Sequence, residues 1–551
     1  MRSLSQPLIG DSFPAREPRQ SLPTRISSHV ARRLSVIGVV EIPRHGTVVG
    51  ASINTLCNVI GAGVLSLPLA MYEASVTGGV VLMVYIAILA GFSAFAVVVG
   101  CEATQRFSFT EVLAFTLFPP RTFEEYCASV LNVPAEDYIE AEKGTMEMEI
   151  LFTQYSQDEV SRRKRRRILT VLVELIIFLN NYGALIIYAR VIADSIPPVA
   201  KGFLNLSGFV ATRNFWLLVS GVVFFFLSCT RNMEELKWTS LVGFLTILYI
   251  VLSVTARYFT SQREVPFPNV DPKERGEINW YHVGTGIFRT MSAYGVAFAY
   301  HYNVPYFYRE LRVRTPKNMM KSVYITFPVI FTCYLTTGIF GYLTFGDIVA
   351  RKDIGGDIAR SYPDDDTVVN IGRLGLFVHF ACVYPILSIC ARRGLHRLIM
   401  NALTWSEQTE RMEEEREFMH LSFQGDGKVG LDSNINAAET HIDRDVGSPE
   451  DTTLLAIVSE AFFLVSTTIV LAAFISGISM VIDFSGTLFG IFLMLTGPGI
   501  ISWFVFSRPQ ITGFAPYRFA RLLMGISVVL ITTGIGFTVA GLVFAIKNYV
   551  K

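Results

Sequence analysis

The sequence is poor in the residues on which most enzymes, metal proteins and disulfide-bonded proteins depend. Only 17% of its 551 residues are charged, and it holds 8 histidines and 7 cysteines. The spacing of the cysteines suits neither a zinc site nor a disulfide framework. The sequence contains no His-Glu-x-x-His or Gly-x-Ser-x-Gly motif, and no pair of aspartates within an apolar run. We therefore expect no enzyme activity, no metal and no cofactor, and the net charge of +1 gives no reason to expect a nucleic-acid partner.

Apolar residues dominate instead. They make up 51% of the chain, and the mean hydropathy is +0.43, which is unlike a soluble globular protein. Several apolar runs reach the ~18 to 20 residues that a helix needs to cross a bilayer. We predict an all-α integral membrane protein whose eleven transmembrane helices lie near residues 50–73, 78–101, 168–193, 214–230, 238–258, 282–304, 321–345, 367–390, 453–475, 482–506 and 521–546.

The basic residues predict how these helices are oriented. The arginines of residues 1–49, the run 162–167 and the lysines and arginines of 309–321 all fall on one side of an eleven-helix chain. Cytoplasmic connections are enriched in Lys and Arg, so this side is predicted to be the cytoplasm. The single Asn-x-Ser/Thr acceptor, Asn205, falls on the opposite side, as a glycosylation site requires. The run 162–167 is interpreted as a topogenic anchor, with binding of anionic lipid as the alternative.

The segments outside the helices differ in character. Residues 1–49, rich in Arg, Ser and Pro, are predicted to be a disordered cytoplasmic tail, and 50–546 to form the transmembrane domain. Two long connections, 102–167 and 391–452, are predicted to be cytoplasmic loops. The second contains a Gly-, Asp-, Asn- and Ser-rich stretch, and we expect a mobile loop that is open to a regulatory partner. Residues 547–551 form a short C-terminus on the non-cytoplasmic side.

The first apolar segment is interrupted in its middle. Gly61, Ala62 and Gly63 are followed by Pro68, within a stretch of otherwise helix-forming residues. A backbone group that is freed inside lipid costs several kcal/mol unless something binds it. Secondary transporters build substrate sites from such discontinuous helices. The alternative is a close helix crossing, because small residues also let two backbones approach.

The sixth apolar segment carries a second interruption. Residues 294–305 combine aromatic and polar side chains with Gly295 and end at Pro305. Interruptions in helices 1 and 6 occupy corresponding positions in two inverted five-helix repeats, so a ligand between them would meet both. Freed amides suit a carboxylate and freed carbonyls suit an ammonium group or a cation, so an amino acid satisfies both, although small amines and monocarboxylates also fit. The predicted substrate-binding residues are Asn58, Gly61, Ala62, Gly63, Val64, Tyr294, Phe298 and His301.

Five short motifs, in order, resemble those of one family. They are residues 58–68 in the first segment, 301–311 after the sixth, 341–346 at the end of the seventh, Arg373-Leu374 with Tyr384-Pro385 in the eighth, and Ser485-Gly486 in the tenth. With these motifs the chain resembles the amino acid/auxin permease family, which includes the system A/N, proton-coupled and vacuolar amino acid transporters. The resemblance spans residues 45–546 apart from the two long loops. It implies a LeuT-like fold of two five-helix inverted repeats, with substrate held by discontinuous helices 1 and 6 and lined by helices 3 and 8.

The eighth segment departs from the sodium-coupled branch of that family. The resemblance places a sodium-binding Thr two residues before Pro385, where this chain has Val383, next to Ala381 and Cys382. None of these side chains offers the oxygen that sodium prefers. Asn54 does match the first-helix Asn of that branch. The sequence therefore favours proton coupling or sodium-independent exchange over sodium symport.

A proton-coupled carrier needs a titratable group within the membrane. The predicted coupling candidates are Asn54, Glu174, His301 and His379. His301 is the best placed, because it lies in the interrupted segment and its ordinary pKa is near the working pH. The alternatives are a hydrogen-bonded neutral imidazole for His301, an ion pair of Glu174 with Arg190, and a packed ring for His379.

The prediction from the sequence is a secondary-active amino acid transporter that works by alternating access. The alternatives are a sodium-coupled amino acid symporter and an amino acid sensor with little net transport. The expected partners are an amino acid, the lipid bilayer and a regulatory protein at 391–452. The plasma membrane and the lysosomal or vacuolar membrane both fit the sequence, as do neutral and cationic substrates. A further expectation places Asp483 at the outer surface.

Overall fold

The computed structural model describes residues 46–121, 126, 146–203, 205–229, 237–261, 272–424, 453–475, 477–508 and 520–549. All of them belong to one compact unit, which comprises Arg44–Val429 and Asp445–Lys551. Most of the predicted tail, 1–49, lies outside the described residues, and so does the stretch 425–452 of the predicted loop 391–452.

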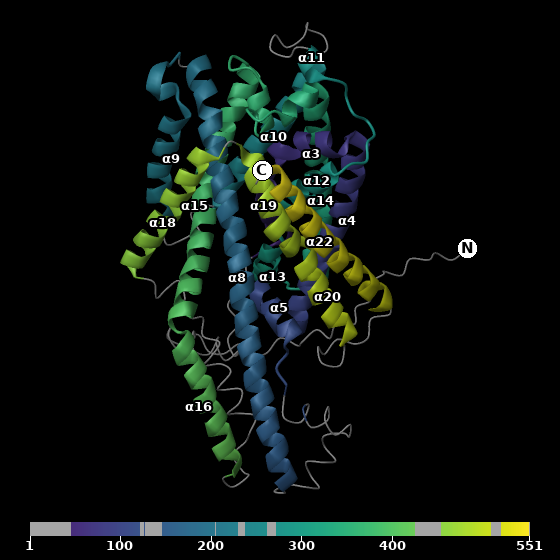
Figure 1. Ribbon diagram of the computed structural model, residues 1–551, viewed down its shortest axis with the longest axis vertical. Coiled ribbons are helices and arrows are strands. Elements are labelled where there is room, and N and C mark those ends of the chain that lie inside the picture. Colours follow the sequence, from purple (N-terminus) through teal and green to yellow (C-terminus); the bar gives the residue numbers. More distant parts are fainter. Residues whose placement is uncertain are drawn as a thin grey trace, which may run out of the picture. The chain divides into compact units, whose positions relative to one another are not determined.

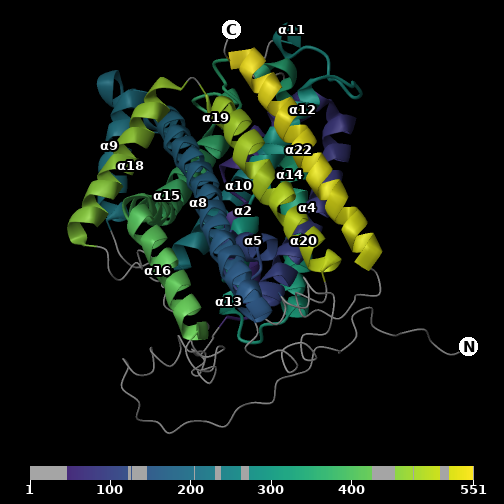
Figure 2. The ribbon, with the colours of Figure 1, turned by 60° about the horizontal axis from the view of Figure 1, so that its bottom comes forward.

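All regular secondary structure among the described residues is helical, apart from a single β-bridge between Gly46 and Leu311. Figures 1 and 2 show the main helices. They are α2 Val48–Val59, α3 Leu67–Ala74, α4 Val76–Thr104, α5 Phe109–Leu117, α8 Met146–Gly202, α9 Arg213–Ser228, α10 Lys237–Ser261, α11 Pro272–Arg275, α12 Gly286–Ala297, α13 Val304–Glu310, α14 Pro316–Phe345, α15 Thr367–Leu403, α16 Trp405–Gln424, α18 Leu454–Phe474, α19 Ile478–Ser485, α20 Gly497–Ser507 and α22 Ala520–Tyr549. This confirms the predicted all-α fold class.

Eight helices in the described part of the chain are long and apolar enough to cross a membrane, or nine if the bent pair α2 and α3 counts as one crossing. Helices or helix pairs lie over all eleven predicted segments. Two of these segments fall short of the length criterion: α9 has 16 residues, and α12 has 12 residues before its helix breaks. The protein is thus a multi-pass membrane protein, and the number of eleven crossings stays a prediction.

The helix α8 is much longer than the predicted segment 168–193. It runs for 57 residues from Met146 to Gly202, and prolines enter it only near its end, at Pro197 and Pro198. Its first 22 positions are largely polar, so hydropathy marks only the later, apolar part of the helix. Residues 146–167 are therefore helical rather than loop. The same holds for the start of the predicted loop 391–452, because α15 continues to Leu403 and α16 follows it directly.

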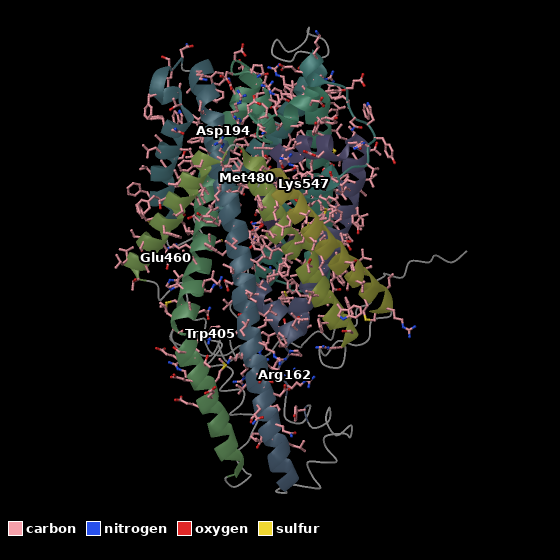
Figure 3. The ribbon with its side chains drawn as sticks, in the orientation of Figure 1. Arg162, Asp194, Trp405, Glu460, Met480 and Lys547 are labelled. Atoms are coloured by element: carbon pink, nitrogen blue, oxygen red, sulfur yellow. The ribbon has the colours of Figure 1, made fainter. Side chains whose placement is uncertain are left out.

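Part of the basic run 162–167 is tied down within the protein. Arg166 forms a buried ion pair with Glu159 at 2.8 Å, two helical turns earlier on α8. The guanidinium of Arg167 lies over the ring of Trp405 in α16 at 4.2 Å. Figure 3 shows Trp405 and Arg162 toward the same end of these helices. Lys164 remains exposed, so the run both anchors α16 to α8 and presents charge to its surroundings.

Helix α19 continues into η7 Gly486–Gly490, a π-helical turn inside the tenth segment. The backbone of η7 lies in close contact with α12. A Cβ atom at Gly486 would lie 2.0 Å from the carbonyl oxygen of Ser292 on α12. At Gly490 it would lie 2.6 Å from the carbonyl oxygen of Gly295. Real Cβ atoms do not approach backbone oxygens this closely, so both contacts require glycine.

We expect Gly486→Ala to destabilise the protein by about 1–3 kcal/mol, because the added methyl must push the α12 backbone away from η7. The measurement is the thermal unfolding midpoint of the purified protein in detergent. Gly536→Ala in α22 is the matched control, since a Cβ there meets nothing within 4 Å. Equal midpoints for the two variants would contradict the close contact.

Candidate functional site

The first discontinuous helix bends at the predicted interruption. Helix α2 ends at Val59, the one-turn 3₁₀ helix η1 Ala62–Ser66 follows Gly61, and α3 begins at Leu67. The two halves are bent by 45°. Helix α2 packs against α14 and α10. The first residues of a helical turn have no acceptor for their N–H groups within that turn, so the break leaves the amides of residues 61–63 without helical partners.

The second discontinuous helix breaks in the same way. Helix α12 ends at Ala297, residues 298–300 are not helical, and the short 3₁₀ helix η4 His301–Asn303 leads into α13. Pro305 lies in the first turn of α13, where its missing N–H costs nothing. The breaks in helices 1 and 6 are thereby confirmed.

The two breaks are in direct contact. A Cβ atom at Gly63 would lie 3.1 Å from Cα and 3.2 Å from Cβ of Ala297, the last residue of α12. A Cβ at Gly61 would lie 3.1 Å from the hydroxyl of Tyr188 on α8. Glycine at 63 therefore allows the backbone of the first break to lie against the end of the second. The third helix reaches the same point.

One hydroxyl group joins the ends of both half-helices. Tyr334 of α14 is completely buried, and its Oη lies 2.7 Å from the carbonyl oxygen of Val59 and 2.8 Å from that of Ala297. Phe298 packs edge-on against the Tyr334 ring at 5.1 Å. Tyr334 thus donates to carbonyls that the two breaks release.

Helix α2 exposes two opposite edges. Val49 and Ile53 are exposed on one edge, and Asn54 and Asn58 are exposed on the other, about 140° away around the helix. Asn303 of η4 donates a hydrogen bond to the Asn58 side chain at 3.0 Å. Lipid suits the apolar edge but would leave amide groups without partners, so the polar edge is the one suited to water. The residues after the break, Ala62–Ser66, are all buried.

The family model described as "Transmembrane amino acid transporter protein" matches residues 44–544, which is nearly the whole chain. The chain belongs to this transmembrane amino acid transporter family.

Relatives within the family are distant. The amino acid transporter AVT6E of Arabidopsis thaliana is 24% identical over 64% of this chain and 63% of its own length. Vacuolar amino acid transporter 2 of Saccharomyces cerevisiae is 23% identical over 61% of this chain and 58% of its own, and solute carrier family 38 member 8 of Mus musculus is 27% identical over 39% and 49%. The chain thus spans less than two thirds of the length of these relatives. The solved structure of MhsT in complex with L-phenylalanine covers 91% of this chain and 100% of its own, at 9% identity and a TM-score of 0.42, and a likeness of that size supports no argument.

The predicted substrate-binding residues of this family member do not all face the breaks. Residues 61–64 and Phe298 lie at the contact between the two breaks. Tyr294 instead donates to the carbonyl of Gly79 at 2.8 Å, and Nε2 of His301 lies 2.9 Å from the carbonyl of Ala90. Gly79 and Ala90 both belong to α4, so these two side chains face helix 2. A direct substrate contact for either one stays a prediction.

The alternative that paired Glu174 with Arg190 is wrong, and the role of Glu174 as a coupling group stays a prediction. Glu174 forms an ion pair with Arg397 of α15 at 2.5 Å, whereas Arg190 pairs with Asp194 at 2.7 Å. Glu174 and Arg190 are both on α8, and 16 residues of helix separate them by about 24 Å. Glu174 thus joins helices 3 and 8 toward the end of α8 that carries the basic run.

His379 lies between two helices. A Cβ at Gly243 of α10 would lie 2.4 Å from Nδ1 of His379, and the ring of Phe380 meets the imidazole at 4.7 Å. This placement agrees with the alternative of a packed ring. Asn205 is exposed between α8 and α9 with a φ of 51°, a conformation that Asn tolerates, so the predicted sequon is accessible.

A charged cluster at the other end of the bundle joins four helices. Arg289 of α12 forms ion pairs with Glu73 of α3 at 2.8 Å and with Asp483 of α19 at 3.0 Å. The hydroxyl of Tyr549, near the end of α22, donates to Asp483 at 2.8 Å. We call these four residues the outer cluster, after the side that the basic residues predict to be non-cytoplasmic. Asp483 is only 2% exposed, so the expectation that it lies at the surface is wrong. This cluster was not predicted from the sequence. Arg289 could have indicated it, because a cation inside a predicted membrane segment needs charged partners.

A second charged cluster lies where the connection between α14 and α15 meets α8. Asp194 of α8 forms ion pairs with Arg190 at 2.7 Å and with Arg360 at 3.4 Å. Figure 3 shows Asp194 at the end of α8 opposite to Arg162. Asp357 caps the turn η6 Ile358–Ser361 by accepting from the amide of Ala359 at 2.9 Å. Burial, and then the nearby Asp194, raise the pKa of Asp357 to about 6.

The raised pKa of Asp357 predicts a pH dependence of stability. The ordinary pKa is 3.8, so between about pH 4 and pH 6 the folded state holds a proton that the unfolded state has lost. Stability therefore falls as the pH rises through this window, by about 3 kcal/mol in total, and is constant above it. Asp357→Asn keeps the cap but not the charge. We expect it to unfold at a higher temperature than the unaltered protein at pH 7 and at nearly the same temperature at pH 4, and a constant difference would contradict the buried charge.

Gly63→Val is expected to abolish amino acid uptake in proteoliposomes while the protein still expresses and elutes as a single species. The reason is that the added carbons have no room beside the backbone of Ala297. Gly91→Val in α4 is the control, because a Cβ there meets nothing within 4 Å. Normal uptake by Gly63→Val would show that the contact between the breaks is dispensable.

Proposed function

We propose that this protein is a secondary-active transporter that moves amino acids across a membrane by alternating access. The observation that carries the proposal is the contact between the two breaks, where Gly63 lies against Ala297. Broken helices that meet within a bundle bring freed amides and freed carbonyls to one place, as a ligand with two opposite charges requires. Membership of the transmembrane amino acid transporter family supports the same ligand.

The geometry favours one orientation of the substrate. The amides at residues 61–63 lie at the N-terminal start of η1 and suit the carboxylate. The end carbonyls of α2 and α12 accept from Tyr334, and the carbonyls of Phe298 and Tyr300 accept from backbone amides. The carbonyl of Ala299 is therefore the one in the second break that is left for the amino group. Exposed Asn58 is placed to contact a substrate that enters along the polar edge of α2.

The two sides of the breaks differ, which supports alternating access. The polar edge with Asn54 and Asn58 is accessible before the break, on the side that the basic residues assign to the cytoplasm. On the other side the outer cluster joins α3, α12, α19 and α22 through Arg289. This conformation would be the inward-facing one. Opening toward the outside requires the ion pairs of Arg289 to separate.

The proposed coupling ion is the proton rather than sodium. Ala381, Cys382 and Val383 of α15 bring no side-chain oxygen to the sodium position implied by the family resemblance. His301 is buried, and its Nδ1 has no hydrogen-bond partner among the described residues. An imidazole with a free ring nitrogen can accept a proton during the transport cycle.

We expect His301→Gln to flatten the pH dependence of uptake, because glutamine keeps a donor for the carbonyl of Ala90 but cannot titrate. The measurement is uptake by proteoliposomes at a series of external pH values with the internal pH fixed. His379→Gln is the comparison and should keep the unaltered profile. An unchanged profile for His301→Gln would remove this residue as the coupling group.

The direct test of the function is uptake of a panel of radiolabelled amino acids, with and without sodium and with and without a pH gradient. Uptake that follows the proton gradient in sodium-free buffer is the expected result. Uptake that requires sodium would replace the proton by sodium, and measurable binding without uptake would favour an amino acid sensor.

A further inference from the structure

Two acceptors compete for one proton at the ends of the broken helices. The hydroxyl of Tyr334 has a single hydrogen, and it lies within 2.7 Å and 2.8 Å of the carbonyl oxygens of Val59 and Ala297. Both carbonyls belong to the last residue of a helix, where the negative ends of the helix dipoles gather. Three helices therefore meet at one oxygen atom, in surroundings with an excess of acceptors.

Such a convergence of carbonyls is the arrangement that binds small cations. Half-helix C-terminal ends and unwound carbonyls coordinate sodium in transporters with broken helices. Hard cations take oxygen ligands from backbone carbonyls, at separations close to those of a hydrogen bond. At this point the chain places an uncharged O–H group, fixed by the packing of Phe298 against its ring.

We propose that the Tyr334 hydroxyl is a built-in substitute for a coupling cation: it fills the point where the end carbonyls of the two broken helices converge, and without it that point becomes a monovalent-cation site. The inference deepens the proposed sodium-independent transport and rests on it. It assigns the choice of coupling ion to α14 as well as to α15, where Val383 stands. Tyr334 is a specificity-determining residue in this account.

The test is Tyr334→Phe, which removes one oxygen atom and keeps the ring. Two buried carbonyls are then left without a donor, so the variant should lose about ten-fold of its uptake in choline chloride and recover it in sodium, lithium or potassium chloride. A second readout does not depend on transport. The unfolding midpoint of the purified variant should rise with the concentration of one of these salts relative to choline chloride, and that of the unaltered protein should not.

Tyr342→Phe is the matched control. Tyr342 is on the same helix and equally buried, but its hydroxyl accepts from the amide of Asn279 at 2.9 Å and bridges no carbonyl pair. We expect a loss of stability without any dependence on the cation. A cation response as large as that of Tyr334→Phe would overturn the proposal, and so would a Tyr334→Phe variant whose unfolding midpoint is the same in all four salts.

The outcomes separate this inference from the proposed function. If the unaltered protein transports no amino acid, the salt dependence of the unfolding midpoint still decides the role of Tyr334. If Tyr334→Phe yields no folded protein in any salt, 4-aminophenylalanine at 334 supplies one N–H for each carbonyl. That variant should fold without a cation response, and failure to fold would overturn the proposal.

Discussion

The structure depends on one constraint, which is that a helix broken inside a membrane must find partners for the backbone groups it releases. Helices α2 and α12 both break, at Val59 and at Ala297, and both breaks use the same partner. The hydroxyl of Tyr334 is the hydrogen-bond donor for one carbonyl of each break, and Gly63 allows the two backbones to come into contact. The backbone groups that each break releases are thus satisfied within the protein, and neither break would be tolerated alone in lipid.

The same constraint places the charged side chains. Arg289 is half-buried among apolar helices, and it satisfies its donors with Glu73 and Asp483 from two other helices and with the hydroxyl of Tyr549. The guanidinium of Arg289 holds the neighbouring helices in position while water is excluded from it, because separating it from either carboxylate would leave an uncompensated charge. The breaks of α2 and α12 lie in the middle of the bundle, where they suit ligand binding. The ion pairs of Arg289 lie toward one end, where they suit closure of that side of the bundle. Those are the two requirements of a carrier.

Much of this was predictable from the sequence, for physical reasons. Gly61, Gly63 and Pro305 are unfavourable inside a membrane helix, so they mark the breaks without any knowledge of the fold. Hydropathy likewise locates the apolar segments. It cannot locate α8 before residue 168, because a polar helix outside the membrane has no hydropathy signal.

The orientation of individual side chains was less predictable. His301 and Tyr294 follow or precede a break, and the rotation of a helix relative to its neighbours after a break is not encoded by spacing, so their contacts with α4 were missed. Tyr334 looks like any other aromatic residue in an apolar run, and its role depends on contacts with residues 275 and 37 positions away. The ion pair of Glu174 with Arg190 was the wrong alternative, because the actual partner, Arg397, can be recognised only from the packing of α15 on α8.

The length of α8 has a mechanical consequence. From Glu159, tied to Arg166, to Asp194, tied to Arg190 and Arg360, the helix contains no proline and spans about 50 Å. A continuous helix of this kind behaves as a lever rather than as a chain of joints. Any tilt of α8 that rearranges the salt bridges of Asp194 would also move Arg167, whose guanidinium lies over the ring of Trp405 in α16. A change of conformation at Asp194 would therefore reach α16 through about 40 Å of unbroken helix.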